Sequence, residues 1–114
     1  MDVERGDVVL VDLDPTKGSE QGKTRPALVI QNDVGNDYSP TTIVAPLTTS
    51  YDKVYPVNVE IRAEESNLEK DGVVLLNQIV TVDIEERIIK KLTTLDQEKM
   101  QEVDNAIRIS LGLE

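Results

Sequence analysis

The sequence contains no cysteine, histidine, tryptophan or phenylalanine, and its only aromatic residues are three tyrosines. Without cysteine the chain forms neither a disulfide nor a thiolate metal site. Without histidine it lacks a frequent metal ligand and the side chain that most often acts as a general base near neutral pH. The composition therefore disfavours a transition-metal hydrolase and any mechanism that depends on a catalytic histidine.

Long apolar runs are also missing, since none approaches the roughly 20 residues that a membrane-spanning helix needs. The first residues, Met-Asp-Val-Glu-Arg, have neither the basic region nor the apolar region of a signal peptide. We therefore expect a cytoplasmic protein without membrane attachment. Its 114 residues suit a single domain that covers residues 1–114.

Acidic side chains outnumber basic ones by 22 to 12, which gives a net charge of −10. A protein of this charge does not bind nucleic acid tightly through its overall field. The charge is uneven, however, because the segment 15–32 carries Lys17, Lys23 and Arg25 against Glu20 alone. We expect a phosphate-bearing ligand to approach this segment, although the same cations would also suit an ordinary solvated loop.

Arg25 stands at the junction between a polar loop and an apolar run. Pro26 fixes its own φ and favours an extended conformation for Arg25. The run Ala-Leu-Val-Ile at 27–30 then indicates a buried strand. The Arg25 guanidinium is thus placed where a loop joins a rigid strand, which is a common position for binding and catalytic groups. An arginine that ends its strand in a surface ion pair fits the local sequence equally well.

The predicted elements are several strands followed by one helix. The pattern predicts strands at about 6–13, 25–31, 41–47, 57–61, 73–82 and 87–92, a loop at 32–40 and one helical turn within 63–70. Pro46 indicates an edge position or a bulge in its strand. Because strands and helices do not alternate, this order predicts a mainly β fold, a small and strongly bent antiparallel sheet or barrel covered by a C-terminal helix.

The C-terminal segment is the clearest helix. Asp96 is a suitable N-cap for it. The apolar residues that recur at helical spacing are Met100, Val103, Ile107 and Leu111. Ile109 and Leu113 fall outside this stripe, and they either widen the face toward the core or contact a partner or a second subunit.

Five segments of the sequence follow one another in a specific order. They are Arg5-Gly6-Asp7-Val8, Gly18-Ser19-Glu20-Gln21-Gly22, Arg25-Pro26-Ala27-Leu28-Val29-Ile30-Gln31-Asn32, Thr41-Thr42-Ile43-Val44-Ala45-Pro46-Leu47-Thr48 and Leu76-Asn77-Gln78-Ile79-Val80-Thr81-Val82-Asp83. In this order, and with the terminal helix, they resemble the MazF/PemK family of toxins over nearly the whole chain. These are the endoribonucleases of type II toxin–antitoxin pairs. The resemblance implies an SH3-like barrel and a homodimer as the working unit.

The resemblance also implies an activity, namely sequence-selective cleavage of single-stranded RNA (mRNA in the cell) without a metal ion or cofactor. The 2′-hydroxyl attacks the adjacent phosphate to give 2′,3′-cyclic phosphate and 5′-hydroxyl ends, and the loss of mRNA inhibits translation and growth. Such a reaction needs in-line geometry, two proton transfers and donors for a charged transition state. In the family an Arg before Pro and a Thr at the end of the third strand form the catalytic pair, which correspond to Arg25 and Thr48.

The chemistry of these side chains fits the implied reaction. Arg25 offers a planar fork of donors for a phosphate. Because arginine stays protonated, with a pKa above about 12, we expect it to stabilise charge and to protonate the leaving 5′-oxygen. Thr48 offers a hydroxyl to a non-bridging oxygen, although a strand-end cap is the commoner use of threonine. Glu20 is expected either to accept a proton or to read a base, since carboxylates accept hydrogen bonds from the cytosine amino group.

Single-stranded RNA is usually read by stacking and by hydrogen bonds to base edges. The expected RNA-binding residues are Lys17, Ser19, Glu20, Gln21, Lys23, Asn32 and Gln78. Tyr51 and Tyr55 either stack on a base or pack over a sheet edge. Two residues depart from the family pattern: Asn77 stands where an acidic residue is frequent, and Val80 where a basic one is frequent. These departures bear on the cleavage sequence.

The implied partner is a MazE-like antitoxin whose acidic, partly disordered tail folds over the toxin and competes with RNA for the cationic loop. Any association with DNA is expected only through that antitoxin. An alternative function is a non-enzymatic toxin with the same barrel fold that binds and traps a topoisomerase. The acidic net charge and the positions of Ile109 and Leu113 fit such a protein partner.

Overall fold

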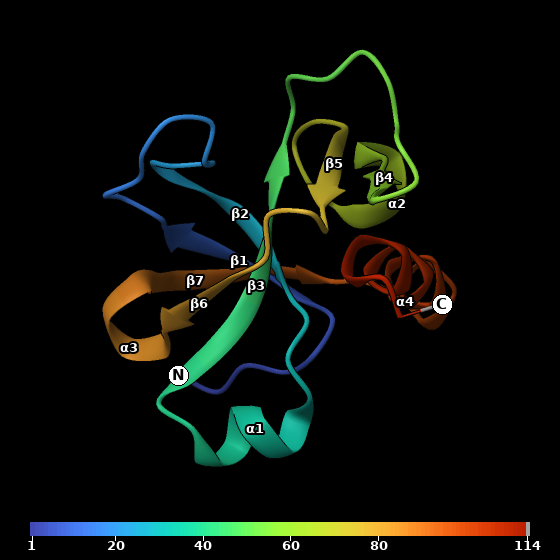
Figure 1. The fold of residues 1–114 in the computed structure, drawn as a ribbon. Coiled ribbons are helices and arrows are strands. Elements are labelled where there is room, and N and C mark those ends of the chain that lie inside the picture. The colour runs from blue at the N-terminus through green and yellow to red at the C-terminus, as the bar shows by residue number, and fades with distance from the viewer. Residues whose placement is uncertain (114) are drawn as a thin grey trace.

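A computed structural model describes residues 1–113 of the chain. The strands are β1 (Asp7–Asp12), β2 (Thr24–Val29), β3 (Thr41–Thr48), β4 (Asn58–Ile61), β5 (Gly72–Leu75), β6 (Val80–Asp83) and β7 (Ile88–Thr94). The helices are α1 (Asp33–Tyr38), α2 (Ala63–Ser66), α3 (Ile84–Arg87) and α4 (Gln97–Leu111). The strands form a bent antiparallel sheet in the order β4-β5-β3-β2-β1-β7, and α4 lies beside its β4–β5 end (Figure 1). The predicted fold class is confirmed.

Strand β3 organises the sheet because it pairs with three other strands. Along one side it pairs with β2, whereas on the other side β6 pairs with its first half and β5 with its last two residues. The carbonyls of Ile43 and Leu47 are directed toward β2. By the alternation of a strand, the nitrogen of Pro46 is therefore directed into the gap between β6 and β5. Strand β3 is therefore central and not an edge strand, and Pro46 lies at a local break in its pairing, which accommodates the missing N–H.

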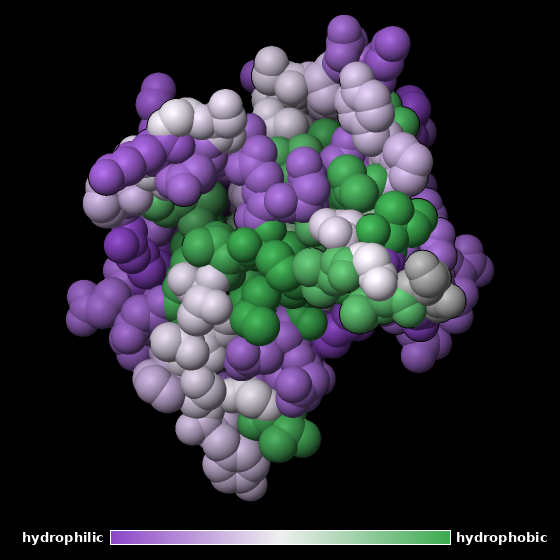
Figure 2. Space-filling model, in the orientation of Figure 1, coloured by the Kyte–Doolittle hydropathy of each residue, from purple (hydrophilic) through white to green (hydrophobic). Residues whose placement is uncertain are grey.

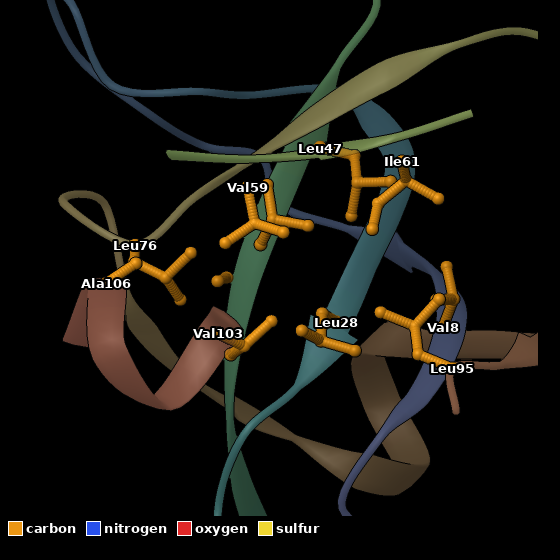
Figure 3. Packing of buried hydrophobic residues seen from close by; sticks show 11 residues of the cluster. Val8, Leu28, Leu47, Val59, Ile61, Leu76, Leu95, Val103 and Ala106 are labelled. Carbon is orange, nitrogen blue, oxygen red and sulfur yellow. The ribbon is translucent and has the colours of Figure 1, made fainter. Parts of the chain in front are cut away.

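The hydrophobic core has one cluster on each face of the sheet. The cluster under α4 includes Leu28, Val59 and Leu76, together with Val103 and Ala106 of α4 itself (Figure 3). The cluster on the opposite face comprises Val3, Val9, Val11, Leu13, Ala27, Val29, Val44, Val82, Ile84 and Ile88. Neighbouring strand residues such as Val8 and Val9 alternate between the clusters, as expected for a sheet that is buried on both faces.

Helix α4 begins where the sequence predicts, with the Asp96 side chain accepting a hydrogen bond from the Lys99 amide at 2.8 Å. The core-facing stripe is partly different from the predicted one, because Ala106 is buried and Leu111 is exposed. Ile109 and Leu113 are also exposed, so the wider core face is wrong. None of the helices in residues 1–113 is long and apolar enough to cross a membrane.

Two predicted elements are wrong. The segment 32–40 contains helix α1, which lacks apolar periodicity and depends on a polar cap and a buried amide in place of an apolar face. The segment 73–82 is two strands, because the chain leaves the end of β3 after β5 and returns to the start of β3 as β6. Between these strands the Leu76 amide donates to the Val57 carbonyl at 3.1 Å.

The Arg5-Gly6-Asp7 motif fixes the N-terminal strand to the rest of the fold. The Arg5 side chain donates to the Ile30 carbonyl at 2.9 Å and forms an ion pair with Asp104 of α4. The buried Asp7 carboxylate accepts from the Thr94 hydroxyl at 2.9 Å and lies 3.4 Å from the Lys91 ammonium. This motif is therefore structural, and the polar residues at the other end of the sheet remain to form a site.

Candidate functional site

Arg25 and Thr48 lie at the same end of the sheet, on neighbouring strands. The β2–β3 register places Ala27 opposite Pro46 and Leu28 opposite Ala45. Continuing that register by two residues places Arg25 opposite Thr48. Opposed residues project from the same face of a sheet, so the two side chains share one face. Strand pairing thus brings together two residues that are far apart in the sequence.

The Arg25 guanidinium is held in place by two backbone carbonyls. Its Nε donates to the Gly22 carbonyl at 2.8 Å and its Nη1 to the Leu47 carbonyl at 3.3 Å. Among residues 1–113 Arg25 forms no ion pair, and its Nη2 donates no hydrogen bond to a protein group. The strand-end ion pair considered from the sequence is therefore wrong. The arrangement leaves an oriented donor edge for an anion.

Thr48 combines the two functions that the sequence left open. Its hydroxyl oxygen accepts a hydrogen bond from the Ser50 amide at 3.2 Å, so it caps the end of β3. Its hydroxyl proton is not used in that bond, and the side chain lines a surface groove. The cap fixes the oxygen and leaves the proton for a ligand.

The loop between β1 and β2 is held by polar contacts. The Lys23 amide donates to the Asp14 carboxylate at 2.7 Å, and the Arg87 guanidinium donates to the carbonyl of Asp14. At Gly22 a Cβ would lie 2.2 Å from the Thr16 hydroxyl, so any larger residue would displace the Thr16 and Asp14 side chains that hold the loop. The sequence shows the glycines but gives no sign of Arg87, which is distant in the chain.

The predicted RNA-binding residues of this loop are held in a defined arrangement. The Glu20 carboxylate accepts from the Lys17 amide at 2.8 Å. Gln78, which follows β5, accepts from the Gln21 amide at 2.9 Å and donates to the Ser19 carbonyl at 3.4 Å. The Gln78 side chain therefore fastens the loop to the β5–β6 connection, and its amide is already engaged.

Two grooves flank this Gln78–Gln21 contact and share Gln21, Asn77 and Gln78 in their walls. The larger groove, of about 650 Å³, lies between the loop and β6 and includes Asp12, Glu20 and Arg87. The smaller groove, of about 300 Å³, lies along the ends of β3 and β4. Its lining includes Thr48, Tyr51, Tyr55, Asn58 and Val73.

The smaller groove contains two of the tyrosines. The Tyr51 hydroxyl donates to the Glu60 carboxylate at 2.8 Å. Partial burial, and then that hydrogen bond to Glu60, raises the pKa of Tyr51. Tyr55 is 56% exposed. Whether either ring stacks on a base stays a prediction.

The structure does not bring Asn32 to the other predicted residues. Its side chain accepts from the Gly35 amide at 2.8 Å and caps α1, beyond the opposite end of β2 from Arg25. Lys17 and Lys23 do lie on the loop, where both are exposed and their ammonium groups form no ion pair within residues 1–113. The described residues contain no group of three or more His, Cys, Asp or Glu side chains placed to hold a metal ion.

An arginine and a threonine at the polar end of a bent antiparallel sheet, with a cationic loop beside them, define a class of small β proteins whose site has the donors that suit an anionic ligand. A model of the PemK-like, MazF-like toxins of type II toxin–antitoxin systems matches residues 4–111. The chain belongs to this family, and the resemblance stated from the sequence is confirmed.

Individual relatives agree with this assignment. A protein named Endoribonuclease MazF, from Staphylococcus epidermidis, is 54% identical over 112 residues, which are 97% of this chain and 92% of the relative. The crystal structure of MazF from Deinococcus radiodurans superposes with a TM-score of 0.85 at 27% identity and covers 98% of each chain. A chain of the MazE-MazF structure from the same organism has a TM-score of 0.77 at 25% identity. The match covers 100% of this chain and 99% of that chain. The predicted class of function is the one named for the first of these relatives.

Proposed function

We propose that the protein is an endoribonuclease toxin that cleaves single-stranded RNA, mRNA in the cytoplasm, without a metal ion. The observation that carries this proposal is the placement of Arg25 and Thr48 on neighbouring strands, just beyond the last paired residues of the β2–β3 ladder, in a chain of the MazF-like family. The name of the 54% identical relative supports the reaction class. The lack of histidine and cysteine in the sequence fits chemistry that uses the RNA's own 2′-hydroxyl.

In the proposed reaction the 2′-oxygen attacks phosphorus, the phosphorus–O5′ bond breaks, and the 5′-oxygen gains a proton. The free edge of Arg25 and the hydroxyl of Thr48 bind the non-bridging oxygens and stabilise the charge that develops on them. Arg25 also supplies the proton to the leaving 5′-oxygen. A solvent base accepts the 2′-proton, because the Glu20 carboxylate accepts from the Lys17 amide and lines the larger groove, whereas Thr48 lines the smaller one.

The proposed working unit is a homodimer. Figure 2 shows a hydrophobic band on the face formed by β3, the β5–β6 connection and the end of α4. Exposed apolar side chains at the end of α4 and just after it are Ile109, Leu111 and Leu113, which line neither groove, so a contact there leaves the larger groove open. Contiguous apolar surface of this kind favours a protein interface, and a second copy would cover it symmetrically.

The proposed regulator is an antitoxin, in agreement with the MazE-MazF structure of the Deinococcus relative. An acidic, partly apolar segment would bind the loop that carries Lys17 and Lys23 and exclude RNA from it. Replacing both lysines by glutamate changes the charge of segment 15–32 from +2 to −2, so both RNA and antitoxin should bind more weakly. A complex with intact RNA and antitoxin on the same site, isolated by size-exclusion chromatography, would contradict this competition.

The activity is tested by incubating the purified, antitoxin-free protein with a randomised single-stranded RNA pool in excess EDTA. We expect fragments with 2′,3′-cyclic phosphate and 5′-hydroxyl ends, and no fragments from a parallel preparation of Arg25→Ala. A folded protein that cleaves nothing in the pool would reject the proposal. In a gyrase supercoiling assay we expect no effect, whereas inhibition there would indicate the topoisomerase-trapping alternative.

A further inference from the structure

The larger groove is poorly suited to phosphate although it adjoins the cationic loop. Its charged lining residues are Asp12, Glu20 and Arg87. The Arg87 guanidinium donates through Nη1 to the carbonyls of Asp12 and Asp14, and its single positive charge offsets only one of the two carboxylates, so the charged lining is net negative. Each carboxylate has one oxygen that accepts from a backbone amide and one that has no partner among the described residues. Two anionic groups would repel a phosphate, so this groove suits an uncharged part of an RNA strand.

The shape and floor of the groove fit a nucleobase. Its volume is about 650 Å³, and its apolar surface comes from residues such as Leu13, Pro46, Ile79 and Val82. A floor of this kind packs against the face of a base that has been splayed out of a single strand. Polar groups at the rim then meet the edge of the base, where its identity is displayed.

One amide at this rim is free to read that edge. Gln78 is engaged with the backbone of Ser19 and Gln21. Its neighbour Asn77 is exposed and lines both grooves. Its side chain makes no hydrogen bond with residues 1–113. Asn77 therefore offers one acceptor and two donors to a ligand.

We propose that the larger groove is a nucleobase site that selects adenine or cytosine, with Asn77 as its specificity-determining residue. This inference rests on the proposed RNA cleavage. Adenine and cytosine each present an exocyclic amine beside a ring nitrogen that accepts a hydrogen bond. The amide oxygen of Asn77 accepts from the amine and its NH₂ group donates to the ring nitrogen.

The carboxylates at the rim disfavour uracil and guanine. The second proton of the amine is donated to the free oxygen of Glu20 or Asp12. Uracil and guanine place a carbonyl oxygen where adenine and cytosine place the amine. Asn77 alone would tolerate that change by rotating its amide, but the carboxylates would then face a carbonyl oxygen without a proton between them.

The first test compares cleavage of a randomised single-stranded RNA pool by the wild-type protein and by Asn77→Ala, followed by sequencing of the new 5′ ends. For the wild type we expect one position near the cut at which adenine or cytosine is enriched about tenfold or more over uracil and guanine. Asn77→Ala should lose the enrichment at that position only. Asn105→Ala is the matched control, because Asn105 is an exposed amide of α4 that also lacks a hydrogen bond.

The second test removes the amine from the RNA. In an oligonucleotide cleaved at the preferred site, the selected adenine is replaced by purine, or the selected cytosine by 2-pyrimidinone. The wild-type kcat/KM should fall about tenfold, whereas the kcat/KM of Asn77→Ala should respond much less to the same change. If Asn77 were only structural, removing the amine would lower the kcat/KM of Asn77→Ala by the same factor as that of the wild type.

The outcomes separate the two proposals. Three results would overturn the nucleobase site. The first is an unchanged base profile in Asn77→Ala, and the second is selection of uracil or guanine at the position that the variant affects. The third is an amine-free substrate that the wild type cleaves as well as the parent. Each of these results requires a wild-type protein that cleaves RNA. Absence of any cleavage by the wild type would reject the proposed function itself.

Discussion

Strand β2 has Arg25 near its first residue, and Gln31 and Asn32 follow shortly after its last residue. Both ends are polar, and both lie beside an end of β3. At the Asn32 end the polar atoms satisfy one another: the buried Asn36 amide takes four hydrogen bonds, with Gln31, Asp33 and Thr42 as partners. At the Arg25 end the hydrogen bonds hold the backbone of the loop and leave an edge of the guanidinium without a protein partner.

The difference separates a structural cluster from a functional one. A polar group that is buried and fully bonded contributes to stability, and its loss leaves partners unsatisfied. A polar group that is oriented by bonds through some of its atoms, with others free, is preorganised for a ligand. Substitutions at the Arg25 end should therefore change the rate of cleavage, whereas those at the Asn32 end should change the free energy of unfolding.

The largest effect is expected for Arg25→Ala. Removing one donor to a developing charge typically lowers a rate on the order of 10²–10³-fold. Because Arg25 is half-buried and forms no ion pair within residues 1–113, the melting temperature should change little. The measurement is kcat on a preferred oligonucleotide, together with a thermal melt. Arg62→Ala is the control, since this exposed arginine of the α2 N-cap lines neither groove. Wild-type turnover in Arg25→Ala would show that Arg25 only organises the loop.

Thr48 should give a smaller loss of rate and a more informative pattern. Thr48→Ala removes the hydroxyl, and we expect kcat to fall on the order of 10–10²-fold because one neutral donor is lost. Thr48→Ser keeps the hydroxyl that accepts from the Ser50 amide, so most of the rate should return. If the serine variant is as slow as the alanine variant, the methyl group and its packing, and not the hydroxyl, are what the site needs.

At the opposite end, Asn36→Ala should destabilise the fold without slowing the enzyme. The substitution leaves the Thr42 hydroxyl, which is fully buried, without its 2.6 Å acceptor. A buried polar group without a hydrogen-bond partner lowers the free energy of unfolding by about 1–3 kcal/mol. Chemical denaturation measures this loss, and kcat per folded molecule should be unchanged. Asn105→Ala serves as the control, since that side chain is exposed on α4. A large drop in kcat would mean that the two ends of β2 are coupled.

The same contrast explains what sequence alone can predict. The strands follow from their runs of Val, Leu and Ile, and α4 follows from its Asp96 cap and apolar spacing. Helix α1 has no apolar stripe, because a cap and one buried amide stabilise it, and that pattern is indistinguishable from a polar loop. The break after β5 was also hidden, since β5 and β6 both have strand-like sequences and only their pairing with β3 separates them.

For the site, the sequence supplied Arg25 and Thr48 through a resemblance, and the β2–β3 register supplies the physical reason for their proximity. The different roles of Gln78 and Asn77 could not be predicted, because the sequence does not show which of two adjacent amide side chains forms hydrogen bonds with the loop backbone. The contact of Arg87 with the loop was likewise hidden by its distance along the chain.

The smallest effect is expected for Asn32→Ala, and it tests directly whether Asn32 binds RNA. In the structure Asn32 is the N-cap of α1, and its side chain satisfies the Gly35 amide. Losing such a cap typically costs about 1 kcal/mol. We therefore expect a modest decrease in the free energy of unfolding, which Asn32→Asp should largely restore because aspartate is an equally good cap. The KM for RNA and the base preference at every position should match those of the wild type. A raised KM with unchanged stability would instead place Asn32 in the RNA path, and RNA would then have to reach both ends of β2.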